Sequence, residues 1–291
     1  MWAKLYDPLA ELAAVHPRLI RQDATSGLFP FSRGHYLHLH VEAPAWLHAT
    51  LPTWLAISQA EDHLGYLWQA QRHVPGGVKF ASSINRYTLV LQGDLPLHPR
   101  ALVLPRWQIL QQGMVRGLRL LRRLRTRAAA AQPDTQASPS PPVTAELPEH
   151  IQAVLQEGGW SWTTQQGAAL VRVSLQEHVH LVRLAMATDG ILWCGMACPL
   201  PWLPAPVCQR AIHAFMLESN TRLRLVRLSY TVEAQTGVVA EVGVPPDWLD
   251  VTTLGQALEA VAVAAQLLWP VLPTLAAEDV ARLYLQTWWA A

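Results

Sequence analysis

Charged residues are scarce in this chain. Asp, Glu, Lys and Arg together account for 15% of its 291 residues, whereas hydrophobic residues account for 51%. This composition excludes an intrinsically disordered protein, because disordered chains have too little apolar surface to offset the entropy of ordering. The length is enough for two domains of ordinary size.

Cysteine is also scarce. Cys194, Cys198 and Cys208 are the only three, and they lie close together. This pattern excludes a disulfide framework and is typical of a reducing compartment, so we expect a cytoplasmic protein. Zinc and iron–sulfur sites use Cys-x-x-Cys pairs and several further ligands, which this cluster lacks. We therefore predict that the three thiols pack in a core.

The sequence has neither a recognisable leader nor an uninterrupted apolar run. Asp7 and Pro8 interrupt its start and no long apolar stretch follows them, so no signal peptide is predicted. The most apolar segment, Leu254–Leu275, contains Glu259 and has prolines near its end. A membrane span needs about 20 apolar residues with few or no charges. We interpret this segment as a buried core helix and predict no transmembrane segment.

Motifs of familiar catalytic sites are missing. The chain has no Gly-x-Ser-x-Gly elbow, no Gly-x-x-x-x-Gly-Lys loop, no Gly-x-Gly-x-x-Gly and no His-Glu-x-x-His. The carboxylate pairs Glu61-Asp62 and Glu278-Asp279 are typical of solvated surface, because neighbouring residues on a helix do not face each other. We predict no catalytic residue and no cofactor, and hence a protein that is not an enzyme.

Histidine, by contrast, is plentiful, with twelve residues. His38 and His40 share one face of a predicted strand, and His178 and His180 repeat the pattern in the second half. Two histidines at this spacing can share a metal, but no third ligand follows at a fixed distance. Alternation of solvent-facing residues explains both pairs, so no metal site is predicted.

A proline-rich segment divides the chain into two parts of opposite charge. Residues 128–148 contain five prolines and almost no large apolar residue, which predicts a semi-extended linker. Residues 1–131 carry 15 Lys and Arg against 7 Asp and Glu, and residues 132–291 carry 7 against 14. We predict a basic N-terminal domain, 1–127, and an acidic C-terminal domain, 149–291. Such asymmetry docks the halves on each other or steers a partner to one face.

Hydrophobic periodicity predicts an α+β fold for both domains, each a twisted antiparallel sheet packed with helices. The predicted helices of the first domain are 8–21, a mainly helical 45–71, and 106–127, with strands at 35–41 and 78–91. The predicted helices of the second domain are 149–158, 207–219, 253–268 and 277–289, with strands at 167–175, 178–187, 190–200, 223–234 and 237–244.

The two domains also share features that indicate a degenerate repeat. Residues 87–91 resemble residues 228–232, and each segment is followed by a proline-containing loop and a long final helix. This pattern favours tandem copies of one domain type.

Residues 147–275 resemble a known family in their order of elements and in the pattern of their segments. The pattern comprises a first helix that ends in Gly158-Gly159-Trp160, a strand Leu170-Val171-Arg172-Val173, a meander that ends Ile191-Leu192-Trp193-Cys194, a strand Tyr230-Thr231-Val232 and an alanine-rich last helix. It is similar to the type III secretion chaperone-like superfamily, which includes the YbjN-like proteins. The resemblance implies a compact secretion-chaperone-like domain that binds protein partners, often pairs through a sheet or helix face, and has no catalytic residue.

The secretion chaperones themselves are usually short, acidic single domains. This chain adds a basic half and a linker. The resemblance therefore implies a cytoplasmic binding or assembly factor on the same fold rather than a part in secretion.

The predicted helix 106–127 carries the strongest indication of a binding surface. Leu110, Met114, Leu118 and Leu121 form its apolar face. Six arginines crowd its second half: Arg116, Arg119, Arg122, Arg123, Arg125 and Arg127. Arginine near a helix C terminus complements the helix dipole, but six exceed that need. Because guanidinium groups pair with carboxylates and phosphates, we predict a partner with an acidic surface.

The C-terminal pair Trp288 and Trp289 is the second indication of a binding surface. Aromatic residues at a chain end either dock into the core or anchor a partner, and docking is the favoured interpretation.

From these features we predict a non-catalytic protein-binding chaperone, adaptor or assembly factor. A nucleic-acid-binding or anionic-membrane-binding protein that uses helix 106–127 is the alternative, and pairing into a homodimer is left open. The lack of aromatic residues among the arginines disfavours nucleic acid.

Overall fold

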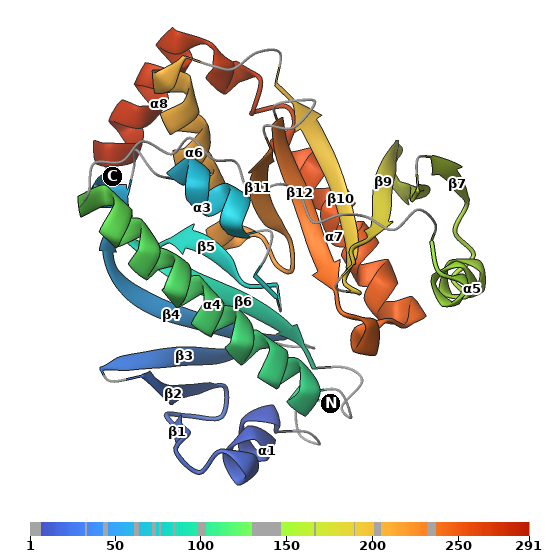
Figure 1. Cartoon of the computed structure of the whole chain (residues 1–291), viewed down its shortest axis with the longest axis horizontal. Coiled ribbons are helices and arrows are strands. Elements are labelled where there is room, and N and C mark those ends of the chain that lie inside the picture. Colours follow the sequence, from blue (N-terminus) through green and yellow to red (C-terminus); the bar gives the residue numbers. More distant parts are fainter. Residues whose placement is uncertain are drawn as a thin grey trace.

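The computed structural model describes residues 7–32, 34–42, 46–60, 64–71, 74–75, 77–83, 85, 87–97, 103–129, 147–165, 167–188, 190–200, 205–231 and 237–290. Within them the chain forms two six-stranded antiparallel sheets flanked by helices, which confirms the predicted α+β fold (Figure 1). Most of the predicted linker, residues 130–146, lies outside the described residues.

The first sheet and its helices come from residues 8–129. Helix α1 (Pro8–Val15) precedes strands β1 (Ile20–Arg21), β2 (Ser26–Ser32), β3 (His35–Glu42) and β4 (Trp46–Ala56), short helices α2 (Ile57–Ala60) and α3 (Leu64–Gln71), strands β5 (Lys79–Ser82) and β6 (Thr88–Pro96), and the long helix α4 (Val103–Ala129). The strands lie in the order β1-β2-β3-β4-β6-β5.

The prediction of a mainly helical segment over 45–71 is wrong for its first part, which is strand β4. Leu47, Leu51 and Leu55 are buried at positions that suit the two-residue period of a strand. Pro52 is tolerated because the pairing of β4 with β3 ends at Thr50, so no β3 carbonyl needs its missing N–H.

Other boundaries in this half also differ from the predictions. Helix α1 ends at Val15 rather than 21, because His16 precedes a proline and is disfavoured in a helix. Strands β1 and β2 were not predicted, and the single strand predicted over 78–91 is two antiparallel strands, β5 and β6. Helix α4 extends the predicted 106–127 by three residues at its start and two at its end.

The second half follows its predictions more closely. Helix α5 (Glu149–Glu157) precedes strands β7 (Trp162–Gln165), β8 (Ala168–Leu175), β9 (His178–Met186) and β10 (Leu192–Pro199), helix α6 (Pro206–Arg222), strands β11 (Arg227–Thr231) and β12 (Gly237–Val244), and helices α7 (Val251–Leu268) and α8 (Glu278–Ala290). Only β7 was not predicted, because its short, largely exposed sequence lacks apolar alternation.

The two halves have the same topology. In each, a helix is followed by four strands, a helical connection, two strands and a long helix, and the second sheet has the order β7-β8-β9-β10-β12-β11. The similar segments 87–91 and 228–232 fall mainly on β6 and β11, which occupy different places in this order. The repeat is therefore carried by the topology and not by that sequence likeness.

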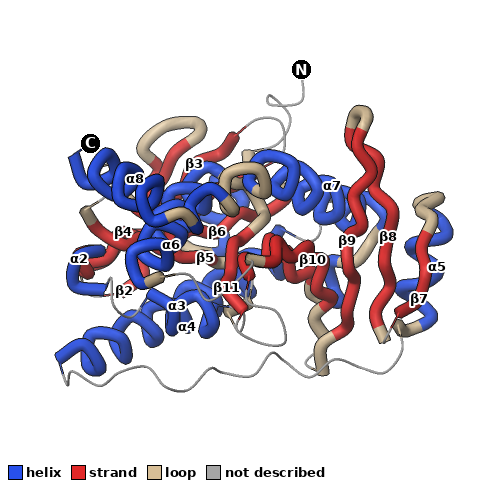
Figure 2. Tube along the Cα trace, turned by 90° about the horizontal axis from the view of Figure 1, so that it is seen from above, coloured by secondary structure: helices blue, strands red, loops and turns tan. Residues whose placement is uncertain are grey.

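The long helices α4 and α7 occupy the same place in the two halves, and each covers one face of its own sheet. Helix α4 packs on β6 and β4, and α7 packs on β8, β9, β10 and β12. They lie on opposite sides of the molecule (Figure 2). Helix α7 is long and apolar enough to cross a membrane, but half of it is buried in the protein, as predicted for a core helix.

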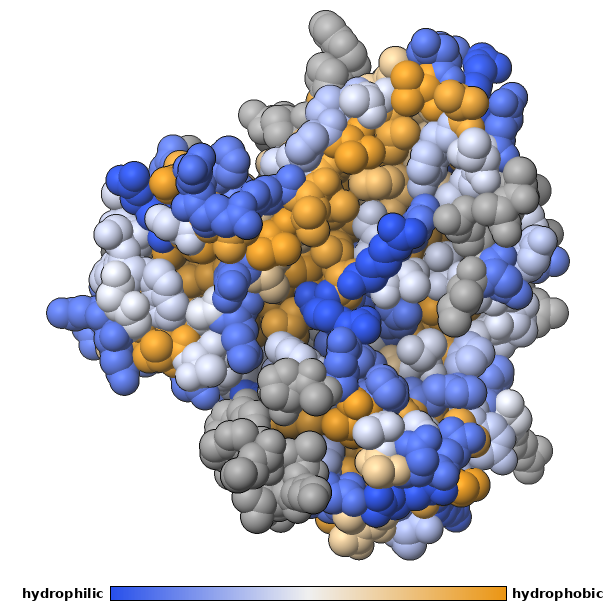
Figure 3. Space-filling model, turned by 180° about the vertical axis from the view of Figure 1, so that it is seen from behind, coloured by the Kyte–Doolittle hydropathy of each residue, from blue (hydrophilic) through white to orange (hydrophobic). Residues whose placement is uncertain are grey.

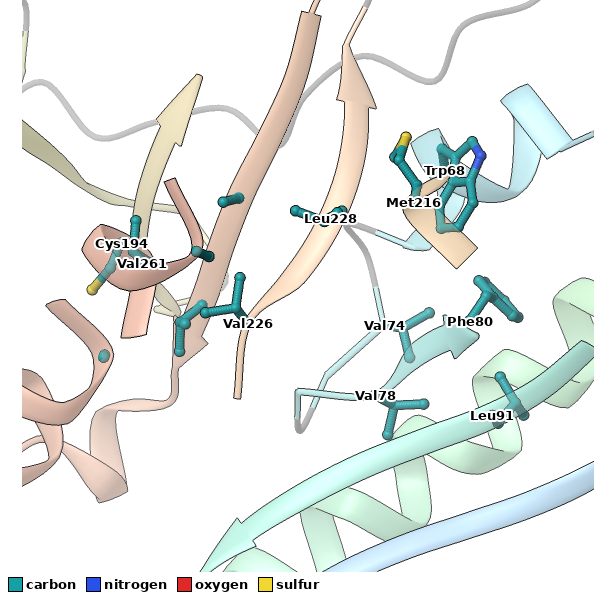
Figure 4. Packing of buried hydrophobic residues seen from close by; sticks show 14 of the residues in the cluster. Trp68, Val74, Val78, Phe80, Leu91, Cys194, Met216, Val226, Leu228 and Val261 are labelled. Atoms are coloured by element: carbon teal, nitrogen blue, oxygen red, sulfur yellow. The ribbon is translucent and has the colours of Figure 1, made fainter. Parts of the chain in front are cut away.

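Buried apolar side chains from both halves form one continuous cluster. Trp68 and Phe80 of the first half and Met216 and Leu228 of the second belong to it (Figure 4). The three cysteines are buried as predicted, and burial raises the pKa of the Cys194 thiol to about 12.

Candidate functional site

Helix α4 is anchored so closely to its sheet that its opposite side is left as a surface. Leu110, Met114 and Leu121 are fully buried, which confirms the predicted apolar face. A Cβ atom at Gly113 would overlap the backbone oxygen of Pro75, and one at Gly117 would lie 2.7 Å from a methyl group of Leu91. The glycines therefore permit the close approach of this helix to β6 and to the segment before β5.

The described arginines of this helix lie on its exposed side. Arg116, Arg119, Arg122 and Arg123 are all exposed, and we call these four residues the arginine face. The side chains of Arg125 and Arg127 lie outside the described residues. The helix has 27 residues, which corresponds to a length of about 40 Å, and its sequence contains no acidic residue.

An open groove of about 710 Å³ runs beside the N-terminal part of the arginine face. Its walls combine Pro75 from the segment before β5 with polar and apolar side chains of α4: Gln108, Gln111, Gln112, Val115, Arg116 and Arg119. Val115 is 38% exposed. The groove therefore offers cationic groups, amide groups and a small apolar contact side by side.

The helix dipole does not account for these arginines. Arg116 and Arg119 lie more than two turns before Ala129, the last residue of α4, and the dipole effect falls off within the last turn. Within the part of the chain that the structure describes, no ion pair joins Arg119, Arg122 or Arg123 to a carboxylate. Among the described residues, the acidic half of the chain thus supplies no ion-pair partner to Arg119, Arg122 or Arg123.

The C-terminal tryptophans differ in what the structure shows. Trp288 is only 3% exposed and belongs to the hydrophobic cluster, so it docks into the core, as the favoured interpretation predicts. The side chain of Trp289 lies outside the described residues.

The histidine pairs lie on strands as predicted. His38 and His40 are exposed on β3, and His178 and His180 lie on β9 with ring centroids 6.5 Å apart. Among the residues that the structure describes, no group of three or more His, Cys, Asp or Glu side chains could hold a metal ion.

A cluster of titratable side chains that was not predicted from the sequence lies between the two halves. His48 of β4 has Nδ1 2.6 Å from Asp94 Oδ1 and Nε2 2.5 Å from Glu42 Oε2. Lys79 Nζ lies 3.2 Å from Asp94 Oδ2, and Arg224 of the second half lies 3.2 Å from Glu42. A lysine and an aspartate inside otherwise apolar strands were the available signal, since such charges are rarely buried unless paired.

This cluster holds a turn of the second half. The backbone N–H of Leu225 donates to Asp94, and Lys79 donates to the carbonyl oxygens of Leu223 and Val226. Burial opposes the charge on Asp94, but Lys79 and His48 outweigh it and hold the pKa of this carboxyl well below its usual range. The charged groups of this cluster are thus paired within the fold. The groove on α4 therefore remains the candidate binding site.

A second buried ion pair lies at the matching place in the other half. Arg227 Nε donates to Glu241 Oε1 at 3.1 Å, and the Arg227 guanidinium lies 4.4 Å from the ring centroid of Trp193. Ser229 also donates to Glu241, at 3.0 Å. These groups satisfy one another, as buried charges require.

The chain was also compared with known proteins. No family model, curated protein or solved structure matches it.

Proposed function

We propose that this protein is a non-catalytic adaptor, chaperone or assembly factor of the cytoplasm that binds an acidic segment of another protein along α4. The observation that carries the proposal is the exposed arginine face beside a groove of about 710 Å³. Carboxylates suit the guanidinium groups, because paired charged hydrogen bonds are the stronger kind.

The groove favours a peptide over a nucleic acid. Gln108, Gln111 and Gln112 each carry both a donor and an acceptor, which matches the N–H and C=O groups of an extended peptide backbone. Nucleic-acid surfaces usually interleave cations with aromatic rings on which bases stack. The only aromatic residue of α4 is Trp107, and it is fully buried.

The packing of α4 also disfavours a membrane surface. A helix that lies on lipid inserts its apolar face among the acyl chains. The apolar face of α4 is buried against its own sheet, at Leu110, Met114, Leu118 and Leu121. The resemblance to the type III secretion chaperone-like and YbjN-like proteins supports the same function, because its members of known function bind proteins.

The proposal is tested with variants of equal charge change. Arg119→Glu/Arg122→Glu reverses two charges of the arginine face, and Arg172→Glu/Arg183→Glu reverses two exposed arginines on β8 and β9. Fluorescence anisotropy measures binding of a labelled Glu- and Asp-rich peptide at low and at physiological salt. We expect the α4 variant to bind about tenfold or more weakly and the control variant to bind like the original protein.

Two outcomes contradict the proposal. Equal loss in both variants means that only overall charge attracts the peptide. Tighter binding of a single-stranded oligonucleotide or of phosphatidylserine vesicles than of the peptide replaces the protein partner with nucleic acid or lipid.

A further inference from the structure

The two halves meet through equivalent elements. Helix α6 of the second half packs on β5 of the first, and α3 of the first half packs beside β11 of the second. Strands β5 and β11 are the last strands of their sheets in the same topological position. Helices α3 and α6 both connect the fourth strand to the fifth. Each half therefore packs its connecting helix against the fifth strand of the other half.

Gln71, at the end of α3, links its own half to the other. Its side-chain oxygen accepts a hydrogen bond from the N–H of Phe80 in its own β5, at 2.7 Å. Its side-chain nitrogen donates to the carbonyl oxygen of Leu228 in β11 of the other half, at 2.8 Å.

Asn220, near the end of α6, makes the equivalent set of contacts in the opposite direction. Its side-chain oxygen accepts from the N–H of Leu228 in its own β11, at 2.8 Å. Its side-chain nitrogen donates to the carbonyl oxygen of Phe80 in β5 of the other half, at 2.9 Å. The two amides thus exchange partners as they would across a two-fold axis, and both are fully buried.

Lys79 and Arg227, the residues before Phe80 and Leu228, also make reciprocal hydrogen bonds to the opposite half, and both carry a positive charge. Lys79 donates to Leu223 and Val226 of the second half, and Arg227 donates to Gln71 and Val74 of the first half, at 2.6 and 2.9 Å. Each cation also pairs with a carboxylate of its own half, Asp94 for Lys79 and Glu241 for Arg227. Both cations are only 1% exposed.

These contacts define a seam, formed by Gln71, Lys79, Phe80, Asn220, Arg227 and Leu228. We infer that the chain is an internally paired dimer of one duplicated unit, in which the seam binds each half to the other half of the same chain. A C2 dimer has an interface in which residue i contacts residue j and j contacts i, and the seam has this form within one chain.

The partner of each half at the seam is the other half of the same chain, because the two halves are covalently joined. Only 17 residues separate Ala129 from Leu147, and a short tether raises the effective concentration to the millimolar range. A half without its partner would exchange the hydrogen bonds of the seam for bonds to water and would expose apolar residues of the shared cluster, and exposing apolar surface is unfavourable. The surface that would pair two copies is therefore already filled.

The test uses the full chain with a protease site placed within 130–146. The protein is folded, cut, diluted to micromolar concentration and analysed by size-exclusion chromatography with light scattering. We expect the two fragments to elute together as a one-to-one complex with the mass of one chain. Separation of the fragments, or a homodimer of either fragment, would overturn the inference.

Variants test the reciprocity of the seam in the cut protein. Gln71→Leu and Asn220→Leu each remove one bond within a half and one between halves. We expect each to raise the dissociation constant of the fragments by about tenfold or more, and by similar factors. Gln59→Leu and Gln152→Leu change exposed glutamines outside the seam and should leave the dissociation constant unchanged. An effect of only one seam variant would contradict the two-fold relation, and the elution of the unsubstituted fragments is informative even if a variant fails to fold.

Discussion

Charged residues of the seam and their carboxylate partners are shielded from water. Lys79 and Asp94 are both almost fully buried, and each needs the other to balance its charge. Lone buried charges are strongly unfavourable, whereas paired ones are tolerated. The stability of the protein should therefore respond sharply to the loss of one partner.

Asp94→Asn should reduce the free energy of unfolding by about 3–5 kcal/mol, because Lys79 is left without a counter-ion. The substitution also weakens the contact with the N–H of Leu225. Urea unfolding at pH 7 measures the change. Glu42→Gln is the comparison, since Glu42 is half exposed, and it should lower stability by less than about 1 kcal/mol. Similar losses in the two variants would show that burial does not decide the effect.

His213 gives a second prediction, which concerns acid. The centroid of its ring lies 6.3 Å from that of Trp68 in α3 and 5.7 Å from that of Tyr230 in β11. Burial lowers the pKa of His213 to about 4. A histidine with a lowered pKa in the folded state stabilises the fold above its ordinary pKa of about 6.5, and this stability is lost as the pH falls toward 4. A lowering of this size corresponds to about 3 kcal/mol of differential interaction between the two protonation states.

His213→Phe should therefore flatten the loss of stability between pH 6.5 and 4. Denaturant unfolding at several pH values measures this slope. His178→Phe, which changes an exposed ring on β9, should keep the slope of the original protein. An unchanged slope in His213→Phe would mean that other groups control the acid response.

At the scale of elements, the approach of α4 to its sheet depends on glycine. Gly113→Ala should lower the free energy of unfolding by about 1–3 kcal/mol, because the added methyl group meets the backbone of Pro75, which cannot move aside easily. Gly117→Ala should have a smaller effect, because the added methyl group meets the end of the Leu91 side chain. Thermal unfolding compares them, and a larger loss for Gly117→Ala would contradict this account.

The sequence predicts elements best where burial is one-sided. The apolar faces of α4 and α7 follow helical spacing, and both helices were predicted within a few residues. Strand β4 was missed because residues such as Trp46, Trp54 and Leu55 are compatible with either period over a short stretch. The arginine face was visible in the sequence, whereas the groove beside it depends on Pro75, which only the fold brings to α4.

At the scale of the whole molecule, the two sheets share one apolar cluster and a set of hydrogen bonds. We therefore expect the chain to unfold in a single transition, with equal calorimetric and van't Hoff enthalpies. Asn220→Leu should separate this into two transitions in differential scanning calorimetry, because it weakens the coupling of the halves. Two transitions in the original protein would show that the halves unfold independently.

The seam itself could not be predicted from the sequence. Gln71 and Asn220 are ordinary amides near helix ends, and their roles appear only when two strands far apart in the chain are brought together. A repeat was predicted from the sequence, but its full topology was not, because β1, β2 and β7 lack a clear apolar alternation.

The pairing of the halves also protects the sheets from their surroundings. Each described sheet has two outer strands, and the helices of the opposite half cover β5 and β11. The remaining outer strands are β1, with two residues, and β7, with four, and short edges of this kind offer little template for a foreign strand. A fold duplicated in this way should resist edge-to-edge aggregation even at high concentration.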